Sequence, residues 1–199
     1  MSKLFRLRVS LAGYLTQPAA RFLARTGVAP NTLTWFGFLL AIGAAVLIAI
    51  GYPFAAGFVV LVAGFFDILD GALARYTNRV THFGAVLDST LDRLSEAVVL
   101  FGILVLYARV QSFVGILLVC LALLSSPLVS YIRARAEGLG LTCQVGLFTR
   151  AERVIVVALG LLLSQIDYAL IVALAVIVVF SFITAGQRLI YVWQQTQNR

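Results

Sequence analysis

Four aspartates lie within otherwise apolar stretches of this chain, and their spacing is its most informative feature. Asp67 and Asp70 are three residues apart, and Asp88 and Asp92 are four apart. A charged Asp at the centre of a membrane helix costs roughly 2.5–3.5 kcal/mol on insertion scales, so four together require compensation. Carboxylate oxygens suit hard divalent cations. The sequence therefore predicts that these aspartates bind metal.

The spacing also predicts that the four carboxylates face one point. Residues 76–83 are expected to form a turn between two antiparallel helices, each rising about 1.5 Å per residue. Asp67 and Asp92 then lie at the same depth, as do Asp70 and Asp88. Separations of three or four residues keep each pair on one helix face. Four acids around one point suit two Mg²⁺ or Mn²⁺ ions better than one.

Small residues and one arginine interrupt the acidic motif. Gly71, Ala74 and Gly84 remove bulk where a ligand would approach the backbone, although small residues in membrane helices also serve close helix packing. Arg75 lies one turn beyond Gly71, where its guanidinium would bind a phosphate in bidentate fashion. A snorkelling side chain at the membrane surface is the simpler interpretation. On spacing alone, these alternatives stay open.

The elements that position these residues are predicted to be membrane helices. The 199 residues are 62% hydrophobic and 12% charged, and the mean hydropathy is +1.03. This composition is typical of an integral membrane protein. Apolar runs predict an all-α fold with six transmembrane helices, at about 33–51, 54–75, 85–108, 112–132, 154–166 and 168–190. The fifth run is short, so five spans are the alternative.

The residues before the first span are predicted to form an amphipathic juxtamembrane helix. Apolar side chains recur at near-helical intervals between Leu4 and Leu23, with basic side chains beside them. Pro18 is expected to break this helix. No linker divides the chain, so we expect a single domain over 1–199, with the amphipathic helix in 1–28 and the six-helix bundle in 29–199.

The basic residues predict the orientation in the membrane. With a cytoplasmic N-terminus, nearly all Lys and Arg residues outside the spans fall on the cytoplasmic side, and Arg109 alone falls on the other. This asymmetry favours six spans, cytoplasmic termini and a site that faces the cytoplasm of a plasma-membrane protein. The net charge of +7 therefore reflects topology first, and nucleic acid is a poor candidate partner.

The acidic motif as a whole resembles the signature of the CDP-alcohol phosphotransferases, membrane enzymes of phospholipid synthesis. The match has no departure and consists of Asp67, Asp70, Gly71, Ala74, Arg75, Gly84, Asp88 and Asp92. The six-span layout is similar to that family over nearly the whole chain. The resemblance also implies a homodimer with one site per subunit.

The resemblance implies a reaction in which a hydroxyl attacks the β-phosphorus of a CDP-linked lipid and expels CMP. Metal at Asp67, Asp70 and Asp88 is then expected to neutralise the pyrophosphate, while Asp92 completes the metal site and acts as general base. Binding of the CDP moiety is assigned to Gly71, Ala74, Arg75 and Gly84, together with Asn31 and Thr34. Capping of the first span is the favoured alternative for Asn31.

The acceptor alcohol is predicted from the arginines of a second segment. Residues 130–153 read SYIRARAEGLGLTCQVGLFTRAER, and their arginines, with Arg188, suit an acceptor that carries a phosphate. The segment resembles that of phosphatidylinositol phosphate synthases and their archaeal counterparts. This resemblance implies transfer of a phosphatidyl group from CDP-diacylglycerol to inositol phosphate. The expected acceptor-binding residues are Arg133, Arg135, Arg153 and Arg188.

The sequence leaves alternatives open for the acceptor, the donor and the class of protein. Glycerol 3-phosphate also carries a phosphate and is the second candidate acceptor, giving phosphatidylglycerophosphate. An ether-linked CDP-lipid is a second candidate donor. From other classes, an aspartate-rich prenyltransferase would place its two acidic motifs far apart in the sequence. A divalent cation transporter would need a polar path to the far side, whereas the outer halves of the predicted spans are apolar.

Overall fold

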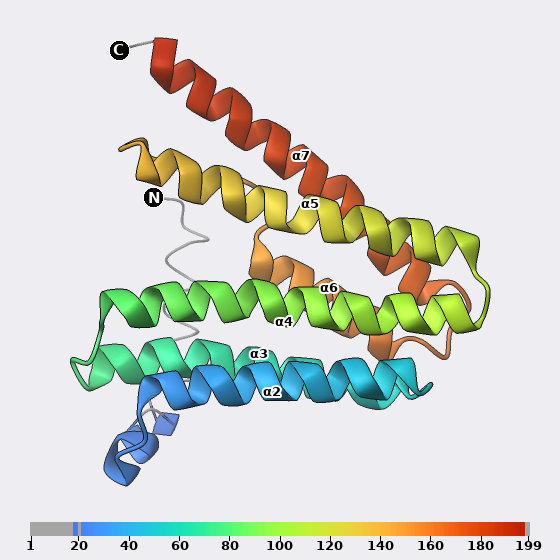
Figure 1. Ribbon diagram of the computed structural model, residues 1–199, viewed down its shortest axis with the longest axis horizontal. Coiled ribbons are helices and arrows are strands. Elements are labelled where there is room, and N and C mark those ends of the chain that lie inside the picture. Colours follow the sequence, from blue (N-terminus) through green and yellow to red (C-terminus); the bar gives the residue numbers. More distant parts are fainter. Residues whose placement is uncertain (1–17, 20, 198–199) are drawn as a thin grey trace.

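The computed structural model describes residues 18–19 and 21–197 and shows an all-helical protein over those residues. A short helical stretch at 18–19 and 21–26 precedes the long helices. These follow in chain order (Figure 1) as α2 (Pro30–Ala49), α3 (Pro53–Tyr76), α4 (His82–Arg109), α5 (Phe113–Gly138), α6 (Arg150–Leu162) and α7 (Ala169–Gln197). No strand occurs in the part of the chain that the structure describes.

The long helices correspond in number and order to the six predicted spans, and four of them meet the length and hydropathy of a membrane span. These four are α2, α3, α5 and α7. Helix α4 has 28 residues but carries charged groups along its first half. Helix α6 has 13 residues and is shorter than the roughly 20 that a perpendicular span needs. The membrane character is thus evident, while the count of six spans stays a prediction.

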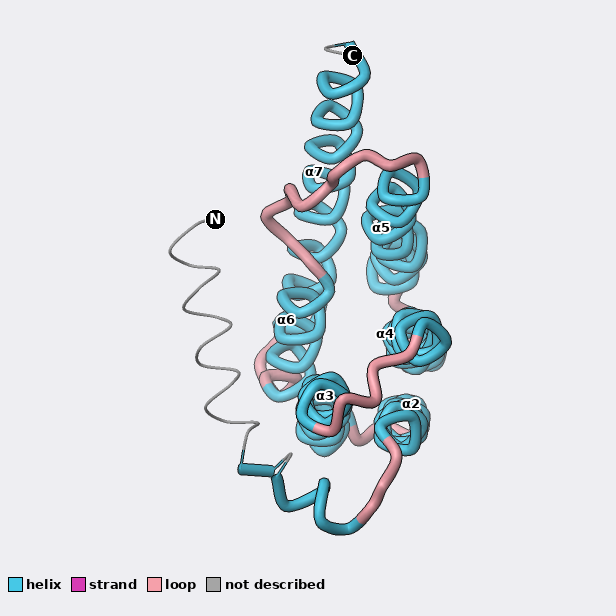
Figure 2. The backbone as a smooth tube through the Cα atoms, turned by 90° about the vertical axis from the view of Figure 1, so that its left-hand side faces the viewer, coloured by secondary structure: helices cyan, strands magenta, loops and turns pink. Residues whose placement is uncertain are grey.

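The six long helices form a ring when seen along their length (Figure 2). Helix α2 packs between α3 and α4, α3 packs against α6, α6 against α7, α7 against α5, and α5 against α4. Helices α3 and α4, which carry the acidic motif, are therefore held mainly through α2 rather than by packing against each other. The interior of the ring between α3, α4 and α6 is where their polar side chains meet.

Small residues allow these helices to approach closely. Ala41, Ala44, Ala56, Ala122 and Ala158 are buried in the main core, which draws on all six long helices. Between α2 and α4 the backbones nearly touch, because a methyl group added at Gly102 would lie 2.6 Å from the carbonyl oxygen of Ala45. Membrane helices pack by such close contacts because lipid supplies no hydrophobic force between them.

The outward faces of the helices carry large apolar side chains. Phe58, Phe101, Leu124 and Val172 are each more than half exposed, and similar residues occur around the ring. A soluble protein rarely exposes so much contiguous apolar surface. These faces suit contact with lipid. The expected amphipathic helix at 1–28 lies mostly outside the described residues, and only its C-terminal part, from Pro18, is described here as helical.

Side chains of α7 hold the loop between α5 and α6. Thr184 Oγ1 accepts a hydrogen bond from the backbone N–H of Phe148 at 3.2 Å. Arg188 Nε donates to the carbonyl oxygen of Val145 at 2.9 Å, and Gln195 donates to that of Thr142 at 2.7 Å. Cys143 in the same loop is buried. These bonds fix the segment that leads into α6, and therefore the direction of its first turn.

Candidate active site

Three of the four aspartates come together at the hairpin of α3 and α4. One carboxylate oxygen each from Asp67, Asp70 and Asp88 lies within 4.8 Å of the other two. The turn ends at Thr81, whose Oγ1 accepts a hydrogen bond from the N–H of Gly84 at 2.9 Å and caps α4. The cap fixes where α4 begins and therefore the register of Asp88 against α3. The predicted turn is present, and three of the four carboxylates predicted to face one point form a cluster.

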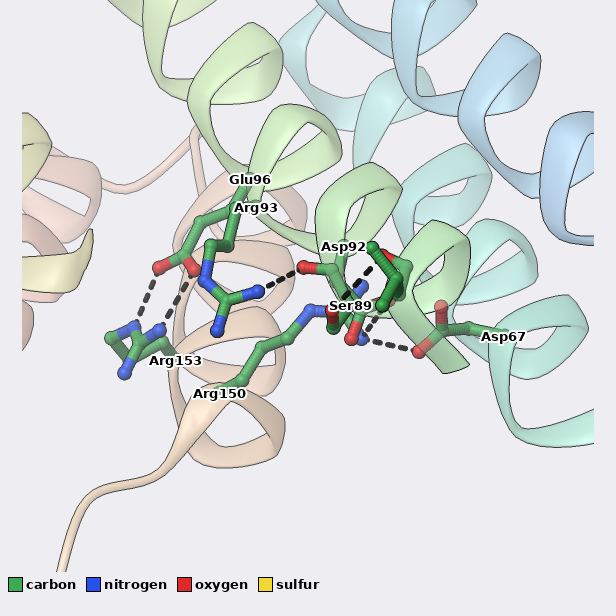
Figure 3. Close-up of polar contacts among 8 residues, drawn as sticks. Asp67, Ser89, Asp92, Arg93, Glu96, Arg150 and Arg153 are labelled. Carbon is green, nitrogen blue, oxygen red and sulfur yellow. Dashed lines mark hydrogen bonds and ion pairs between the residues drawn. The ribbon is translucent and has the colours of Figure 1, made fainter. Parts of the chain in front are cut away.

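The fourth aspartate, Asp92, is joined to Asp67 by an arginine of α6 (Figure 3). Arg150 Nη1 lies 2.6 Å from Asp92 Oδ1 and also pairs with Asp67 Oδ2. All three side chains are about three-quarters buried or more. The equal depth predicted for Asp67 and Asp92 explains why a single guanidinium contacts both.

The donor set fits a hard divalent cation. Asp70 is 4% exposed, and its buried Oδ2 has no hydrogen-bond partner among the described residues. Such an oxygen costs free energy unless a cation or donor meets it. The cluster supplies only carboxylate oxygens, which favour Mg²⁺ or Mn²⁺ over softer metals. With four acids and one arginine, the group keeps an excess of negative charge that metal would neutralise.

A cavity of about 300 Å³ opens beside the carboxylate cluster, between α2, α3 and α4. All six residues expected to bind the CDP moiety line it: Asn31, Thr34, Gly71, Ala74, Arg75 and Gly84. Asp70 and Asp88 form its inner wall, and Arg79 and Thr81 come from the turn. The cavity therefore places a basic, solvent-facing rim next to the carboxylates, as a nucleotide pyrophosphate would require.

The expected cap by Asn31 is wrong. Helix α2 starts at Pro30 with Ala29 as its N-cap, and no side chain caps it. Proline is favoured in the first turn because its missing N–H has no helical partner there. Asn31 is instead inside the first turn and faces Gly84, where an added methyl group would lie 3.3 Å from Asn31 Oδ1. Its amide thus lines the cavity.

Two glycines make space in this cavity. A methyl group added at Gly71 would lie 3.3 Å from Arg75 Nη1, so the guanidinium lies over the Gly71 backbone. A methyl group at Gly84 would lie 2.9 Å from Thr81 Oγ1, in conflict with the cap of α4. The atoms nearest to an added methyl group at both glycines are polar side chains, not another helix backbone, so close packing of another helix does not explain them. Ligand clearance at these two positions stays a prediction.

The four arginines expected to bind the acceptor phosphate differ in their surroundings. Arg133 and Arg135 are exposed at the end of α5, and Arg133 Nε pairs with Glu137 at 2.9 Å. Arg153 is buried and paired with Glu96. Arg188 is buried and donates to the carbonyl oxygens of Val145 and Val129.

Three of these arginines nevertheless form one group. The charges of Arg133 and Arg153 both act on Arg188, with Glu137 as a nearby acid. Arginines of α5, α6 and α7 are therefore near enough for their charges to interact, and Arg188 also bonds to the loop that leads into α6. Such a concentration of guanidinium groups suits an anion with several oxygens.

Arg150 belongs to the arginine-rich segment 130–153, but no role of its own was predicted for it from the sequence. Its contacts with Asp67 and Asp92 depend on where α6 starts. That start is set by a capping box, in which Thr149 N donates to Glu152 at 2.8 Å. The Thr-x-x-Glu spacing at 149–152 was a usable signal, because it predicts a helix beginning at Arg150 with Arg153 on the same face.

Comparisons with known proteins agree with this geometry. The family model of the CDP-alcohol phosphatidyltransferases matches residues 27–187. Archaetidylinositol phosphate synthase of Methanothermobacter thermautotrophicus is 41% identical over 173 residues, which are 86% of either chain.

Two crystal structures of Mycobacterium tuberculosis phosphatidylinositol phosphate synthase are also similar. The structure with CDP-DAG bound has a TM-score of 0.82 at 37% identity, covering 90% of this chain and 94% of that one. The complex with manganese and citrate has a TM-score of 0.80 at 38% identity, covering 89% and 88%.

Proposed function

The chain belongs to the CDP-alcohol phosphatidyltransferase family, and from this we propose that it transfers a phosphatidyl group from CDP-diacylglycerol to inositol phosphate. The products are phosphatidylinositol phosphate and CMP. The observation that carries the proposal is the cavity beside the carboxylates, which all six expected CDP-binding residues line. The similar M. tuberculosis structure with CDP-DAG bound supports the same donor.

In this proposal the carboxylates bind the catalytic metal and the cavity binds the nucleotide. Asp67, Asp70, Asp88 and Asp92 would hold Mg²⁺ or Mn²⁺, and the bound metal would supply positive charge to neutralise the pyrophosphate and the departing CMP. The manganese complex of the similar synthase supports this use of metal. Gly71 and Gly84 admit the CDP moiety close to the backbone, and Arg75 binds a phosphate at the rim. Ala74, Asn31 and Thr34 complete the walls.

Asp92 is proposed as the general base. Its carboxylate lies near Asp67, and Arg150 orients it through the contact at Oδ1. The acceptor hydroxyl would give its proton to this carboxylate as its oxygen attacks the lipid-bearing phosphorus. The bond between that phosphorus and the oxygen bridging to CMP then breaks, and CMP leaves with the electron pair.

The arginines of α5, α6 and α7 are proposed to bind the phosphate of the acceptor. Arg133, Arg135 and Arg153 would donate to its oxygens, and Arg188 would add its charge while holding the loop at Val145. Free inositol or serine lacks the phosphate that such a group recognises. The phosphate therefore distinguishes the proposed acceptor from alcohols that carry none.

The proposal also places the site at the cytoplasmic face of the plasma membrane, with six spans and both termini inside. The arginines at the ends of α3, α5 and α6 support this orientation through the positive-inside rule. The homodimer implied by the family stays a prediction, which the mass of the detergent-solubilised protein measured by light scattering would test.

The deciding experiment measures CMP release by purified protein with CDP-diacylglycerol and Mg²⁺. Inositol phosphate, glycerol 3-phosphate, free inositol and serine are offered in parallel, with Asp92→Asn as the control. We expect turnover with inositol phosphate that the control loses. Turnover with glycerol 3-phosphate instead would overturn the acceptor. No turnover with this donor or its ether-linked analogue, together with metal uptake into vesicles, would favour a transporter.

A further inference from the structure

A buried ion pair crosses the interior of the ring from α4 to α6. Arg153 Nε lies 2.6 Å from Glu96 Oε1, and Nη2 lies 2.8 Å from Oε2. The side chains are 1% and 11% exposed. Two parallel hydrogen bonds of this kind fix the plane of a guanidinium as well as its position. Glu96 therefore decides how the Arg153 head is oriented (Figure 3).

The third nitrogen of Arg153 is left without a partner. Nη1 is buried and has no hydrogen-bond partner among the described residues, and in Figure 3 it points away from Glu96. A buried donor costs free energy when it stays unpaired. Because Glu96 takes the other two nitrogens, Nη1 is the part of this guanidinium that remains for a ligand.

The surroundings indicate the kind of ligand. Arg153 acts by its charge on Arg188, as does Arg133, so positive charge gathers near the Arg153 side chain. On the other side, Arg153 and Glu96 line a cavity together with Asp67 and Arg150. The pair thus lies between the arginine group and the carboxylate cluster. An anion held by Arg153 would therefore be near the carboxylate cluster.

We propose that Glu96 is a positioning residue for the acceptor, which holds Arg153 so that its Nη1 donates to the acceptor phosphate. The inference rests on the proposed function and adds to it a residue outside the acidic motif. Glu96 does not touch the substrate in this proposal. It acts through Arg153, whose guanidinium would otherwise rotate about its long side chain and lose the fixed donor direction.

The test is a double-mutant cycle on Glu96 and Arg153, read as separate KM values for inositol phosphate and CDP-diacylglycerol. We expect Glu96→Gln to raise the KM for inositol phosphate at least fivefold, with the KM for the donor and kcat changed less than twofold. Arg153→Gln should raise the acceptor KM further. When Glu96→Gln is added to Arg153→Gln, the acceptor KM should change less than twofold further, because the two residues act as one unit.

A pair that merely joined α4 to α6 would give another result. Both KM values, kcat and the melting temperature would then change together, and this outcome would overturn the inference. The inference would also fail if the two substitutions raised the acceptor KM by independent factors that multiply in the double variant. Asp167→Asn is the control, because Asp167 is an exposed acid between α6 and α7, and we expect it to change the acceptor KM less than twofold.

The same measurements separate this inference from the proposed function. If the wild type releases no CMP with inositol phosphate, the proposed function fails. If it does, and Arg153→Gln raises the acceptor KM while Glu96→Gln leaves it unchanged, the inference alone fails. If Glu96→Gln does not fold, the double variant Glu96→Ala with Arg153→Ala removes both charges of the pair together. Its acceptor KM is then compared with that of Arg153→Ala.

Discussion

Arg150 Nη1 contacts Asp92 Oδ1 at 2.6 Å and pairs at the same time with Asp67, so one cation of α6 links the aspartates of α3 and α4. Helices α3 and α4 pack mainly against α2, and this ion pair is a direct connection across the space between them. The arrangement makes Arg150 responsible for the mutual position of two proposed metal ligands, one of which is the proposed base.

Replacing Arg150 with Gln should destabilise the protein by about 1–3 kcal/mol, because two largely buried carboxylates lose a charged partner. We also expect kcat to fall more than the KM values. Mn²⁺ should raise the melting temperature of this variant more than that of the wild type, since metal then supplies the missing positive charge. Arg93→Gln is the control, because Arg93 bonds to the carbonyl of Ser89 on its own helix. An equal metal response in both variants would contradict the prediction.

Asp70→Asn should reduce kcat at least 100-fold and weaken Mn²⁺ binding. The buried Asp70 oxygen is part of the carboxylate cluster, and an amide is a poorer ligand for a hard cation. Calorimetric titration of Mn²⁺ into the substrate-free protein checks the binding separately from activity. Asp167→Asn, an exposed acid between α6 and α7, should leave both unchanged. Wild-type Mn²⁺ affinity in Asp70→Asn would refute the metal role.

Gly84→Ala should raise the KM for CDP-diacylglycerol about tenfold while changing the acceptor KM little. The added methyl would lie 2.9 Å from Thr81 Oγ1 and 3.3 Å from Asn31 Oδ1, so it both strains the cap of α4 and narrows the nucleotide cavity. Gly43→Ala on α2 is the control, because nothing lies within 4 Å of the added methyl there. The KM for CDP-diacylglycerol is measured for both variants. An unchanged donor KM in Gly84→Ala would show that the nucleotide does not fit tightly against Gly84.

Gly102→Ala should lower the melting temperature, in keeping with the roughly 1–3 kcal/mol that overpacking costs. Its methyl would lie 2.6 Å from the Ala45 carbonyl oxygen, and α2 would have to move away from α4. Gly186→Ala on α7 has open space and should be neutral. Thermal unfolding in detergent, followed by the fluorescence of Trp35 and Trp193, measures both. If Gly102→Ala melts with the wild type, the close approach of α2 and α4 is not required.

The sequence was sufficient for the local parts of the site. Helical periodicity and the turn at 76–83 placed Asp67, Asp70 and Asp88 together, because all three belong to one hairpin. The contacts of Arg150 and Arg153 were not predictable in this way, since they depend on how α6 is rotated against α3 and α4. Only the capping alternative favoured for Asn31 was wrong, because Pro30 begins the helix and leaves no place for a cap at Asn31.

The closure of the ring by α7 has a consequence for biosynthesis. During translation, α3 and α4 carry Asp67, Asp70 and Asp88 toward the bilayer before Arg150 has left the ribosome, and the loop that positions α6 stays unheld until Thr184 and Arg188 follow. For that interval the nascent hairpin is an acidic segment without its arginine.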